Sequence, residues 1–375
     1  MERLSLTNFR SYKSLSLDVS PEPVVLTGAN GAGKTNLLEA LSLLAPGSGL
    51  RRARLADFRQ RGGGSEGWAV AATLGGPNGC IRIGTGEVAG TPGRRSIRID
   101  GTDVSGQNSL AERLHVIWLT PRMDRLFVDA PSGRRRFLDR LVAGFDPGHG
   151  RRVAAYQRCM RERSQMLKAH RLDLRWLKAI EETIAEYAVA VTAARCDTVA
   201  RLNILLKAPF RSLFPAANIS LEGLVESWLT EMPAVAVEDQ LREALGRSRT
   251  RDREVGSVTL GPHRTDVLVR HTDYDCPAAQ CSTGEQKMLL VAIVLAHARA
   301  QAERSGQTPL MLLDEAMAHL DACHRRYLVD ALCELGAQAW LTGVEADLFS
   351  SFSARAQFLS IDGGRVVRCS GRKSV

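Results

Sequence analysis

Near the amino terminus, the hydrophobic positions change from strand patterns to a helical pattern. Residues 3–9 (RLSLTNF) alternate between apolar and polar types, and residues 23–28 (PVVLTG) contain the short apolar run of a buried strand. Apolar side chains then recur at helical spacing at Leu37, Leu38, Leu41 and Leu44. Because the segment GANGAGKT lies between the second strand and this helix, the pattern predicts a strand, a loop and a helix in succession.

The middle of the chain contains a β-rich part followed by a helical part. Short β-prone runs between Trp68 and Asp100 are separated by turns rich in glycine and proline, which predicts an antiparallel meander. Apolar positions between Arg151 and Lys207 follow helical spacing, and a helix over 174–207 would be about 50 Å long. This interval is too short for a long antiparallel coiled coil. Residues 215–254 are expected to form shorter helices and polar linkers.

Strand and helix patterns alternate again in the last third of the chain. The expected elements are strands at 257–261 and 266–270, a helix from about 285, a strand at 309–315, a helix at 323–335, a strand at 338–342 and a hairpin around 361–367. The chain as a whole therefore predicts an α/β fold in which a mainly helical lobe, 136–254, is inserted between residues 1–135 and 255–375.

Composition places the chain among globular proteins. Of its 375 residues, 44% are hydrophobic and 24% are charged, as in an average soluble domain. There is no run of 18 uncharged apolar residues that could span a membrane. Charged residues in MERLSLTNFR occupy the place of a secretory apolar region, so we expect a cytoplasmic protein with no membrane partner. The cysteines lack metal-binding C-x₂-C spacing and are expected to be reduced thiols.

The net charge of +9 is concentrated in arginine clusters. Such clusters fit a polyanionic partner, chiefly nucleic acid, but an arginine-rich solvated surface explains them equally well. The clusters singled out as candidate DNA contacts are Arg51, Arg52 and Arg54, and Arg134, Arg135 and Arg136.

Residues 28–35 fit the phosphate-loop pattern G-x-x-x-x-G-K-[ST] at every fixed position. The glycines allow backbone N–H groups to face phosphates, Lys34 would span the β- and γ-phosphates, and the Thr35 hydroxyl would ligate Mg²⁺. The expected nucleotide-binding residues are Gly28, Ala29, Asn30, Gly31, Ala32, Gly33, Lys34, Thr35 and Asn36. Since the guanine-specific pattern N-K-x-D is absent, the expected ligands are ATP and Mg²⁺.

A second part of the site follows the apolar run PLMLL. Asp314 and Glu315 stand at the carboxyl end of that strand, where ligand sites of α/β sheets form. We expect Asp314 to hold Mg²⁺ and Glu315 to polarise the attacking water, with Lys34 completing the catalytic set.

Residues 282–286, here called the signature cap, resemble the Ser-x-Gly-[Gly/Glu/Gln]-Gln motif of ABC-class ATPases. Ser282 would cap a helix, Gly284 would supply backbone freedom, and Glu285 and Gln286 would follow in the first turn. In that class the cap meets the γ-phosphate bound by a second subunit, so the resemblance implies a head-to-tail homodimer with ATP. Asp321, at the end of the run AHLD, resembles the D-loop residue that crosses the same interface.

The resemblance to one bacterial family, the RecF recombinational-repair proteins, extends through nearly the whole chain. Its segments, in order, are LSLTNFRSYKSLSL, GANGAGKTNLLEALSLL, GSGLRRAR, SGRRRFLDRL, GPHRTDV and STGEQK. The resemblance implies an ABC-type P-loop ATPase head, with a mixed sheet and an antiparallel β-meander, similar to SMC heads but without a long coiled coil.

The same resemblance implies an ATP-dependent DNA clamp of recombinational and replication-gap repair. With RecO and RecR, such a clamp helps RecA to load at junctions of single- and double-stranded DNA, and it hydrolyses ATP slowly, stimulated by DNA. By resemblance to SMC-type heads, Arg10 reaches the nucleotide phosphates; the alternative is a solvent-facing strand arginine.

Two other functional classes use a phosphate loop. A small-molecule kinase or metabolic NTPase with a helical lid would leave the signature cap and Asp321 without a role. A transporter subunit would have a much shorter interval between loop and cap, and a His after the strand at 338–342, where this chain has Thr342 and Gly343. Both are therefore less favoured.

Overall fold

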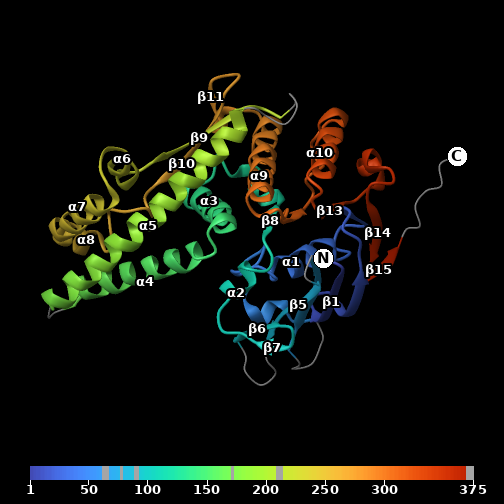
Figure 1. The fold of residues 1–375 in the computed structure, drawn as a ribbon, viewed down its shortest axis with the longest axis horizontal. Helices are drawn as coiled ribbons and strands as arrows, with labels where there is room; N and C mark the ends of the chain where they lie inside the picture. The colour runs from blue at the N-terminus through green and yellow to red at the C-terminus, as the bar shows by residue number, and fades with distance from the viewer. Residues whose placement is uncertain (61–66, 77–78, 88–92, 170–172, 208–213, 369–375) are drawn as a thin grey trace. The chain divides into compact units, whose positions relative to one another are not determined.

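The computed structural model describes residues 1–60, 67–76, 79–87, 93–169, 173–207 and 214–368, in two compact units (Figure 1). The first unit consists mainly of residues 1–124 and 294–375, and the second mainly of residues 125–209 and 215–293. Each unit has its own sheet and core, so each is described by itself below.

The division of the structure differs from the boundaries expected at 135/136 and 254/255. Residues 125–135 and 255–293 belong to the second unit. The reason is that α3 (Pro131–Phe145) is one continuous helix across the first expected boundary, while β10 (Asp266–His271) pairs with β9 (Ala217–Glu222). Hydrogen bonds to an earlier strand thus assign the segment after the second boundary to the helical unit.

The mixed sheet of the first unit carries the nucleotide motifs. Within the described residues its strand order is β15-β14-β3-β13-β12-β8, parallel from β14 to β8, with β15 antiparallel at one edge. Its strands are β3 (Val24–Thr27), β8 (Val116–Leu119), β12 (Leu310–Leu313), β13 (Ala339–Gly343), β14 (Gln357–Asp362) and β15 (Arg365–Arg368). β3 and β12 are buried along their whole length, as parallel strands between two covering layers must be. The mixed sheet is confirmed, although β8 had not been predicted.

The antiparallel sheet of the first unit has the strand order β2-β1-β4-β5-β6-β7. Its strands are β1 (Arg3–Phe9), β2 (Tyr12–Asp18), β4 (Ala69–Gly76), β5 (Gly79–Glu87), β6 (Arg95–Ile99) and β7 (Thr102–Asp103). Leu4 and Leu6 of β1 share one core with Leu37 and Leu41 of α1 (Lys34–Ser42). The meander is confirmed, and this core joins the helix after the phosphate loop to both sheets. The unit also contains η1 (Leu55–Phe58), α2 (Asn108–Ala111), η2 (Pro121–Arg125, ending at the unit boundary), α10 (Ala322–Glu334) and η5 (Ala346–Phe352).

The second unit is mainly helical. Besides α3 it contains α4 (His149–Lys168), α5 (Leu174–Lys207), α6 (Leu224–Glu231), α7 (Ala234–Arg247), α8 (Arg249–Val255), and β9, β10, β11 (Cys276–Pro277) and η4 (Ala278–Gln280). α9 (Thr283–Ser305) begins in this unit, and the unit boundary falls within it. α5, the long helix beside α4 in Figure 1, has the bounds that the apolar spacing predicted. Its apolar face, including Ile180 and Ile184, packs with Val237 and Leu241 of α7.

A buried ion-pair network ties three segments of the second unit together. Arg163 of α4 is fully buried and donates to Glu181 of α5 at 2.9 Å and to Asp252 of α8 at 2.6 Å. Because a buried charge is tolerated only with partners of this kind, the network sets how these helices pack.

The predicted strand over 257–261 does not form. The Thr259 N–H donates to Asp252 Oδ1 at 2.9 Å, and the Val258 carbonyl lies 2.9 Å from His263 Nε2. Side chains thus satisfy the backbone groups that a neighbouring strand would have paired. In the segment 215–254, predicted as helices and linkers, the structure adds strand β9.

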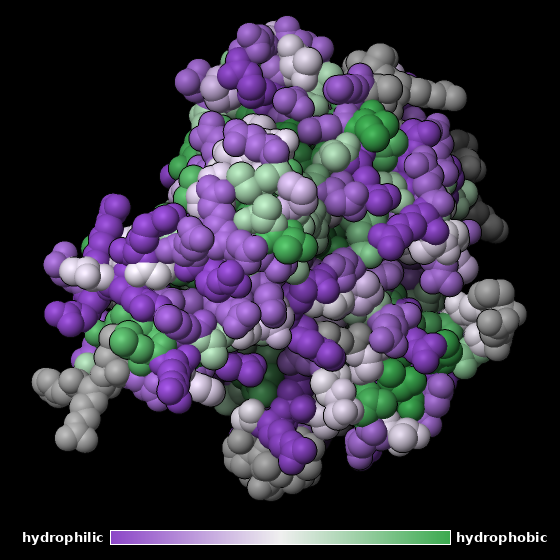
Figure 2. Space-filling model, turned by 60° about the vertical axis from the view of Figure 1, so that its left-hand side comes forward, coloured by the Kyte–Doolittle hydropathy of each residue, from purple (hydrophilic) through white to green (hydrophobic). Residues whose placement is uncertain are grey.

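The surface drawn in Figure 2 is largely hydrophilic, and hydrophobic residues form separate groups among the polar ones. Among the described residues, none of the helices combines the length and the apolar character that crossing a membrane requires.

Candidate nucleotide site

The phosphate loop has the backbone conformation that its glycines permit. Gly28, Gly31 and Gly33 have φ angles of +143°, +81° and +117°, which side-chain-bearing residues rarely adopt. Gly28 also lies against β14, because a Cβ there would be 2.2 Å from the Ile361 carbonyl oxygen. The loop is held from β2 as well, where the buried Tyr12 hydroxyl donates to the Gly33 carbonyl at 3.1 Å. No sequence motif had indicated this contact.

Lys34, the first residue of α1, is directed back onto its own loop. Its ammonium group donates to the carbonyls of Gly28 at 2.6 Å and Ala29 at 2.9 Å. Burial lowers the pKa of Lys34, and the charges of Glu315 and Asp314 oppose that shift. The lysine charge therefore lies within the loop, where a phosphate could replace the two carbonyls as its partner.

The phosphate loop and the acid pair, Asp314 and Glu315, meet at the carboxyl ends of β3 and β12. The Thr35 hydroxyl donates to Asp314 Oδ1 at 3.1 Å, which joins segments far apart in the sequence. Burial raises the pKa of Asp314, while hydrogen bonds from Thr342 and Thr35 favour its charged form. The structure thus places Thr35, Asp314 and Glu315 together as the two motifs predicted.

Thr342, at the end of β13, is a site residue that the motifs did not assign. Its hydroxyl donates to Asp314 Oδ1 at 2.8 Å and accepts from the Glu315 N–H at 2.9 Å. The signal available in the sequence was its position at the end of the apolar strand after the acid pair, close to where transporter subunits carry a His.

The predicted magnesium ligands fit that cation. A hydroxyl and a carboxylate oxygen, from Thr35 and Asp314, lie within hydrogen-bonding distance of each other, and such hard oxygen ligands suit Mg²⁺. Bound Mg²⁺ would supply positive charge to the β- and γ-phosphates. The protein's own contribution is to hold the two oxygens on the loop and on the neighbouring strand.

Arg10, predicted to reach the nucleotide, is placed beside α1. Its guanidinium donates to the two Glu39 carboxylate oxygens at 2.9 and 3.0 Å, and Glu39 is fully buried. Arg51 Nη1 lies 3.5 Å from the same carboxylate and donates to Asn36 at 3.0 Å. Arg10 is thus neither a solvent-facing residue nor shown on a phosphate, and its nucleotide contact stays a prediction.

The signature cap lies at the start of α9. The Ser282 N–H and hydroxyl each donate to Glu285 Oε2 at 2.7 Å, and the Glu285 N–H donates to Ser282 Oγ at 3.3 Å. This is a reciprocal capping box, so the predicted cap residue is confirmed. Gln286 is buried and donates to the Cys281 carbonyl at 2.9 Å, and its side chain therefore fixes the turn before the helix.

Gly284 does not use the backbone freedom that the sequence interpretation assigned to it. It lies in the first turn of α9 without a positive φ angle, and apart from its own helix backbone and chain neighbours no described residue is within 4 Å of an added Cβ. Packing within the described part of the chain therefore does not explain this glycine.

Asp321 caps the next helix, α10. Its side chain accepts from the His324 N–H at 2.8 Å, and its second oxygen lies 2.8 Å from His324 Nδ1. The side chain is exposed, and its predicted role at a subunit interface stays a prediction.

Comparison with known proteins shows the family of this chain. The family model described as the RecF/RecN/SMC N terminal domain matches residues 1–362. A protein of Mesorhizobium japonicum named DNA replication and repair protein RecF is 50% identical over 368 residues, which cover 98% of this chain and 97% of that protein. The chain belongs to the RecF family. A protein of the same name from Allorhizobium ampelinum is 45% identical over 98% of both chains.

Solved structures show the same fold for this RecF-family chain. A structure of the recombination mediator protein RecF with ATP, in the RecFOR pathway, has a TM-score of 0.84 at 22% identity and covers 98% of this chain and 97% of its own. An Smc head bound to the C-winged helix domain of ScpA has a TM-score of 0.57 at 17% identity, covering 98% and 97%. The predicted ABC-type head is thereby confirmed as the fold.

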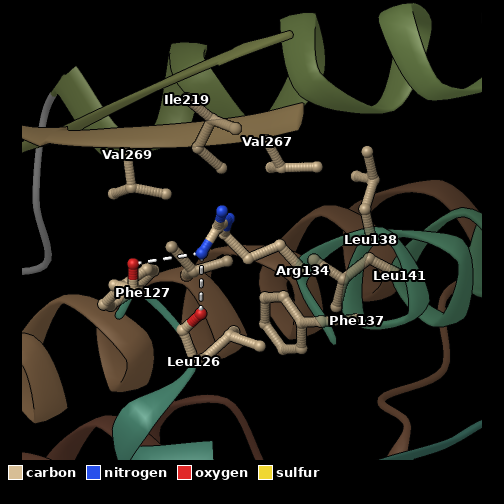
Figure 3. A pocket seen from close by; sticks show the side chains of 10 residues that line it. Leu126, Phe127, Arg134, Phe137, Leu138, Leu141, Ile219, Val267 and Val269 are labelled. Carbon is tan, nitrogen blue, oxygen red and sulfur yellow. Dashed lines mark hydrogen bonds between the residues drawn. The ribbon is translucent and has the colours of Figure 1, made fainter. Parts of the chain in front are cut away.

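One of the arginines expected on DNA is a structural residue of this RecF-family protein. Arg134 donates to both carboxylate oxygens of Asp266 at 2.8 Å. It also donates to the carbonyls of Leu126 and Phe127, as the dashed lines in Figure 3 show. Figure 3 shows its side chain among apolar residues, and only 12% of it is exposed. These contacts within the chain give Arg134 a structural role and leave little of its side chain exposed to a phosphate, so the structure does not support its predicted DNA contact, which stays an untested prediction.

The other candidate DNA contacts differ in exposure. Arg135 is half-buried and donates to the Thr265 carbonyl at 2.7 Å, whereas Arg136 is exposed. Arg51, Arg52 and Arg54 are exposed in the segment between α1 and η1. The four exposed arginines keep their predicted role as a proposal.

Replacing Gly28 by Ala is expected to weaken ATP binding about tenfold, because a strained φ angle and the approach of the Ile361 carbonyl would distort the loop. Titration with a fluorescent ATP analogue measures the change. Gly306→Ala is the control, since Gly306 also has a positive φ of +69° but open space around an added Cβ. Unchanged affinity in the Gly28→Ala variant would show that the loop tolerates a side chain there.

Proposed function

We propose that this RecF-family chain is an ATP-dependent DNA-binding protein of recombinational repair, which acts in the cytoplasm and works as a switch. ATP and Mg²⁺ bind the phosphate loop, and the acid pair hydrolyses the nucleotide. The observation that carries the ATPase proposal is the contact between Thr35 and Asp314, which joins the two halves of a nucleotide site. The relatives' name and the similar solved structure of RecF with ATP are consistent with it.

The proposal includes a head-to-tail dimer in which each signature cap completes the partner's ATP site. Two features of the cap support this. Ser282 is exposed, and its hydroxyl and N–H donate to Glu285, a partner that a phosphate could replace; beside Gly284 there is open space that no other part of the described chain fills. A glycine at such a position lets another molecule approach the helix backbone closely. The γ-phosphate held by a partner subunit is the ligand that this arrangement suits.

DNA is the proposed partner of the closed dimer. The net charge is +9, and the exposed arginines at 51, 52, 54 and 136 supply positive charge for duplex phosphates. Contacts of this kind are independent of base sequence, as repair at arbitrary gaps requires. By resemblance, the dimer acts with RecO and RecR and helps RecA to load at junctions of single- and double-stranded DNA.

Sedimentation of the chain with ATP and Mg²⁺, with and without a gapped duplex, tests this function. We expect a shift from monomer to dimer with ATP, and DNA binding whose logarithmic affinity falls with log salt by about 0.9 for each phosphate contact. The Lys34→Ala chain should remain monomeric under the same conditions. A chain that neither dimerises with ATP nor binds DNA would contradict the proposal.

A further inference from the structure

One side chain outside both nucleotide motifs touches both residues of the acid pair. Thr342 is 1% exposed at the carboxyl end of β13, beside β12. Its hydroxyl donates to Asp314 Oδ1 at 2.8 Å and accepts from the backbone N–H of Glu315 at 2.9 Å. A hydroxyl has one donor and two acceptor positions, so a single Thr342 rotamer serves both partners.

The two hydrogen bonds of Thr342 act on the Asp314 carboxylate and on the Glu315 backbone. Asp314 is buried, and hydrogen bonds from the Thr342 and Thr35 hydroxyls to its Oδ1 fix the orientation of the carboxylate. Glu315 has a φ angle of +52°, a left-handed conformation that a residue with a side chain adopts only when its surroundings hold it. The hydrogen bond from the Glu315 N–H to Thr342 anchors this turn of the backbone at its first residue.

Gly343, the residue after Thr342, limits which side chains the end of β13 can carry. A Cβ on Gly343 would lie 2.5 Å from Phe349 Cε2, and Phe349 is fully buried. A larger side chain at position 343 would require this ring to move. Packing therefore disfavours, at position 343, the His that transporter subunits carry near this point of the chain. Thr342, one residue earlier, is the polar group that the end of β13 directs to the acid pair.

We propose that Thr342 is a positioning residue for ATP hydrolysis, which holds the Asp314 carboxylate and the Glu315 backbone in one fixed arrangement. The hydrogen bonds form a chain from Thr35 through Asp314 to Thr342 and Glu315. The loop that binds phosphate is thereby connected to the residue that orients water. This inference rests on the proposed ATPase function and adds to it a residue outside the two motifs.

Thr342→Val keeps the shape of the side chain and removes the hydroxyl, and Thr342→Ser keeps the hydroxyl. For the Val variant we expect kcat to fall roughly 10- to 100-fold, as for supporting residues of metal sites, with KM for ATP within about threefold of the unchanged chain. The Ser variant should recover kcat to within about threefold. A fluorescent ATP analogue, titrated with and without Mg²⁺, should bind the Val variant normally without Mg²⁺ and lose part of its Mg²⁺-dependent gain.

Thr192→Val is the matched control, because Thr192 is buried in α5 and its hydroxyl donates to the Ala188 carbonyl of the same helix. It should leave kcat and nucleotide binding unchanged. A Thr342→Val chain with unchanged kcat, or equal losses in the Val and Ser variants or in the control, would overturn the positioning role. If the unchanged chain hydrolyses no ATP, the proposed function itself fails, and this inference fails with it.

Discussion

Mixing a Lys34→Ala chain with a Ser282→Arg chain is expected to restore ATPase activity that neither chain has alone. Lys34 lies inside the phosphate loop, so its loss disables the site that its own chain binds. Arg at 282 would remove the capping hydroxyl and place a long charged side chain at the exposed start of α9. In a mixed head-to-tail dimer, one of the two sites then combines an intact loop with an intact signature cap.

The size of the recovery is also predicted. Only a mixed dimer contains an intact ATP site, and it contains one of the two, so at equal concentrations the recovered activity should approach but not exceed about half of the original activity. Steady-state phosphate release over a series of mixing ratios measures it. Thermal melting of each variant, together with the milder Ser282→Ala change, controls for loss of the cap, which typically costs about 1 kcal/mol. If folded variants recover no activity at any ratio, the sites are not shared between subunits.

Glu315→Gln is expected to lower ATP hydrolysis by about 10²- to 10⁴-fold and to accumulate the ATP-bound dimer. The amide keeps the size of the side chain but cannot accept a proton from water. The backbone of residue 315 should be unaffected, because its N–H hydrogen bond to Thr342 does not involve the side chain. Sedimentation with ATP and Mg²⁺, followed by single-turnover hydrolysis, measures both effects.

Glu345→Gln is the matched control for the charge change. Glu345 is an exposed glutamate shortly after β13 in the same unit, and its neutralisation should leave hydrolysis and dimer lifetime unchanged. A Glu315→Gln chain that hydrolyses ATP at the original rate, or that stays monomeric with ATP, would remove Glu315 from the role of activating water.

Much of the fold was predictable because its elements have strong local patterns. The helical spacing of apolar residues predicted α5 over 174–207, and the apolar run before Asp314 predicted β12. The segment 257–261 shows the limit of this reasoning. Its alternation is typical of a strand, but Asp252 and His263 bind its backbone, and no local pattern contains that information.

Some features of the candidate site were likewise predictable from local sequence, and others were not. Glycine and lysine spacing predicted the phosphate loop, and the acid pair was predicted from two consecutive carboxylates after a buried strand. Arginine clusters, in contrast, predicted DNA contacts without distinguishing exposed side chains from Arg134, whose partner Asp266 is distant in the sequence. The charge of an arginine is a local property, but its exposure depends on the packing around it.

The order of residues along the chain was enough to identify the family, from segments along its whole length, and the phosphate loop, the acid pair and the helix cap at Ser282, each of which depends on residues that are close together in sequence. Three-dimensional packing was needed to show that Thr342 joins Asp314 to Glu315 and that Arg134 is held by Asp266. The physical reason is that backbone conformation is set largely by neighbouring residues. The partner of a buried polar side chain is chosen instead by the packing of strands and helices that are distant in the sequence.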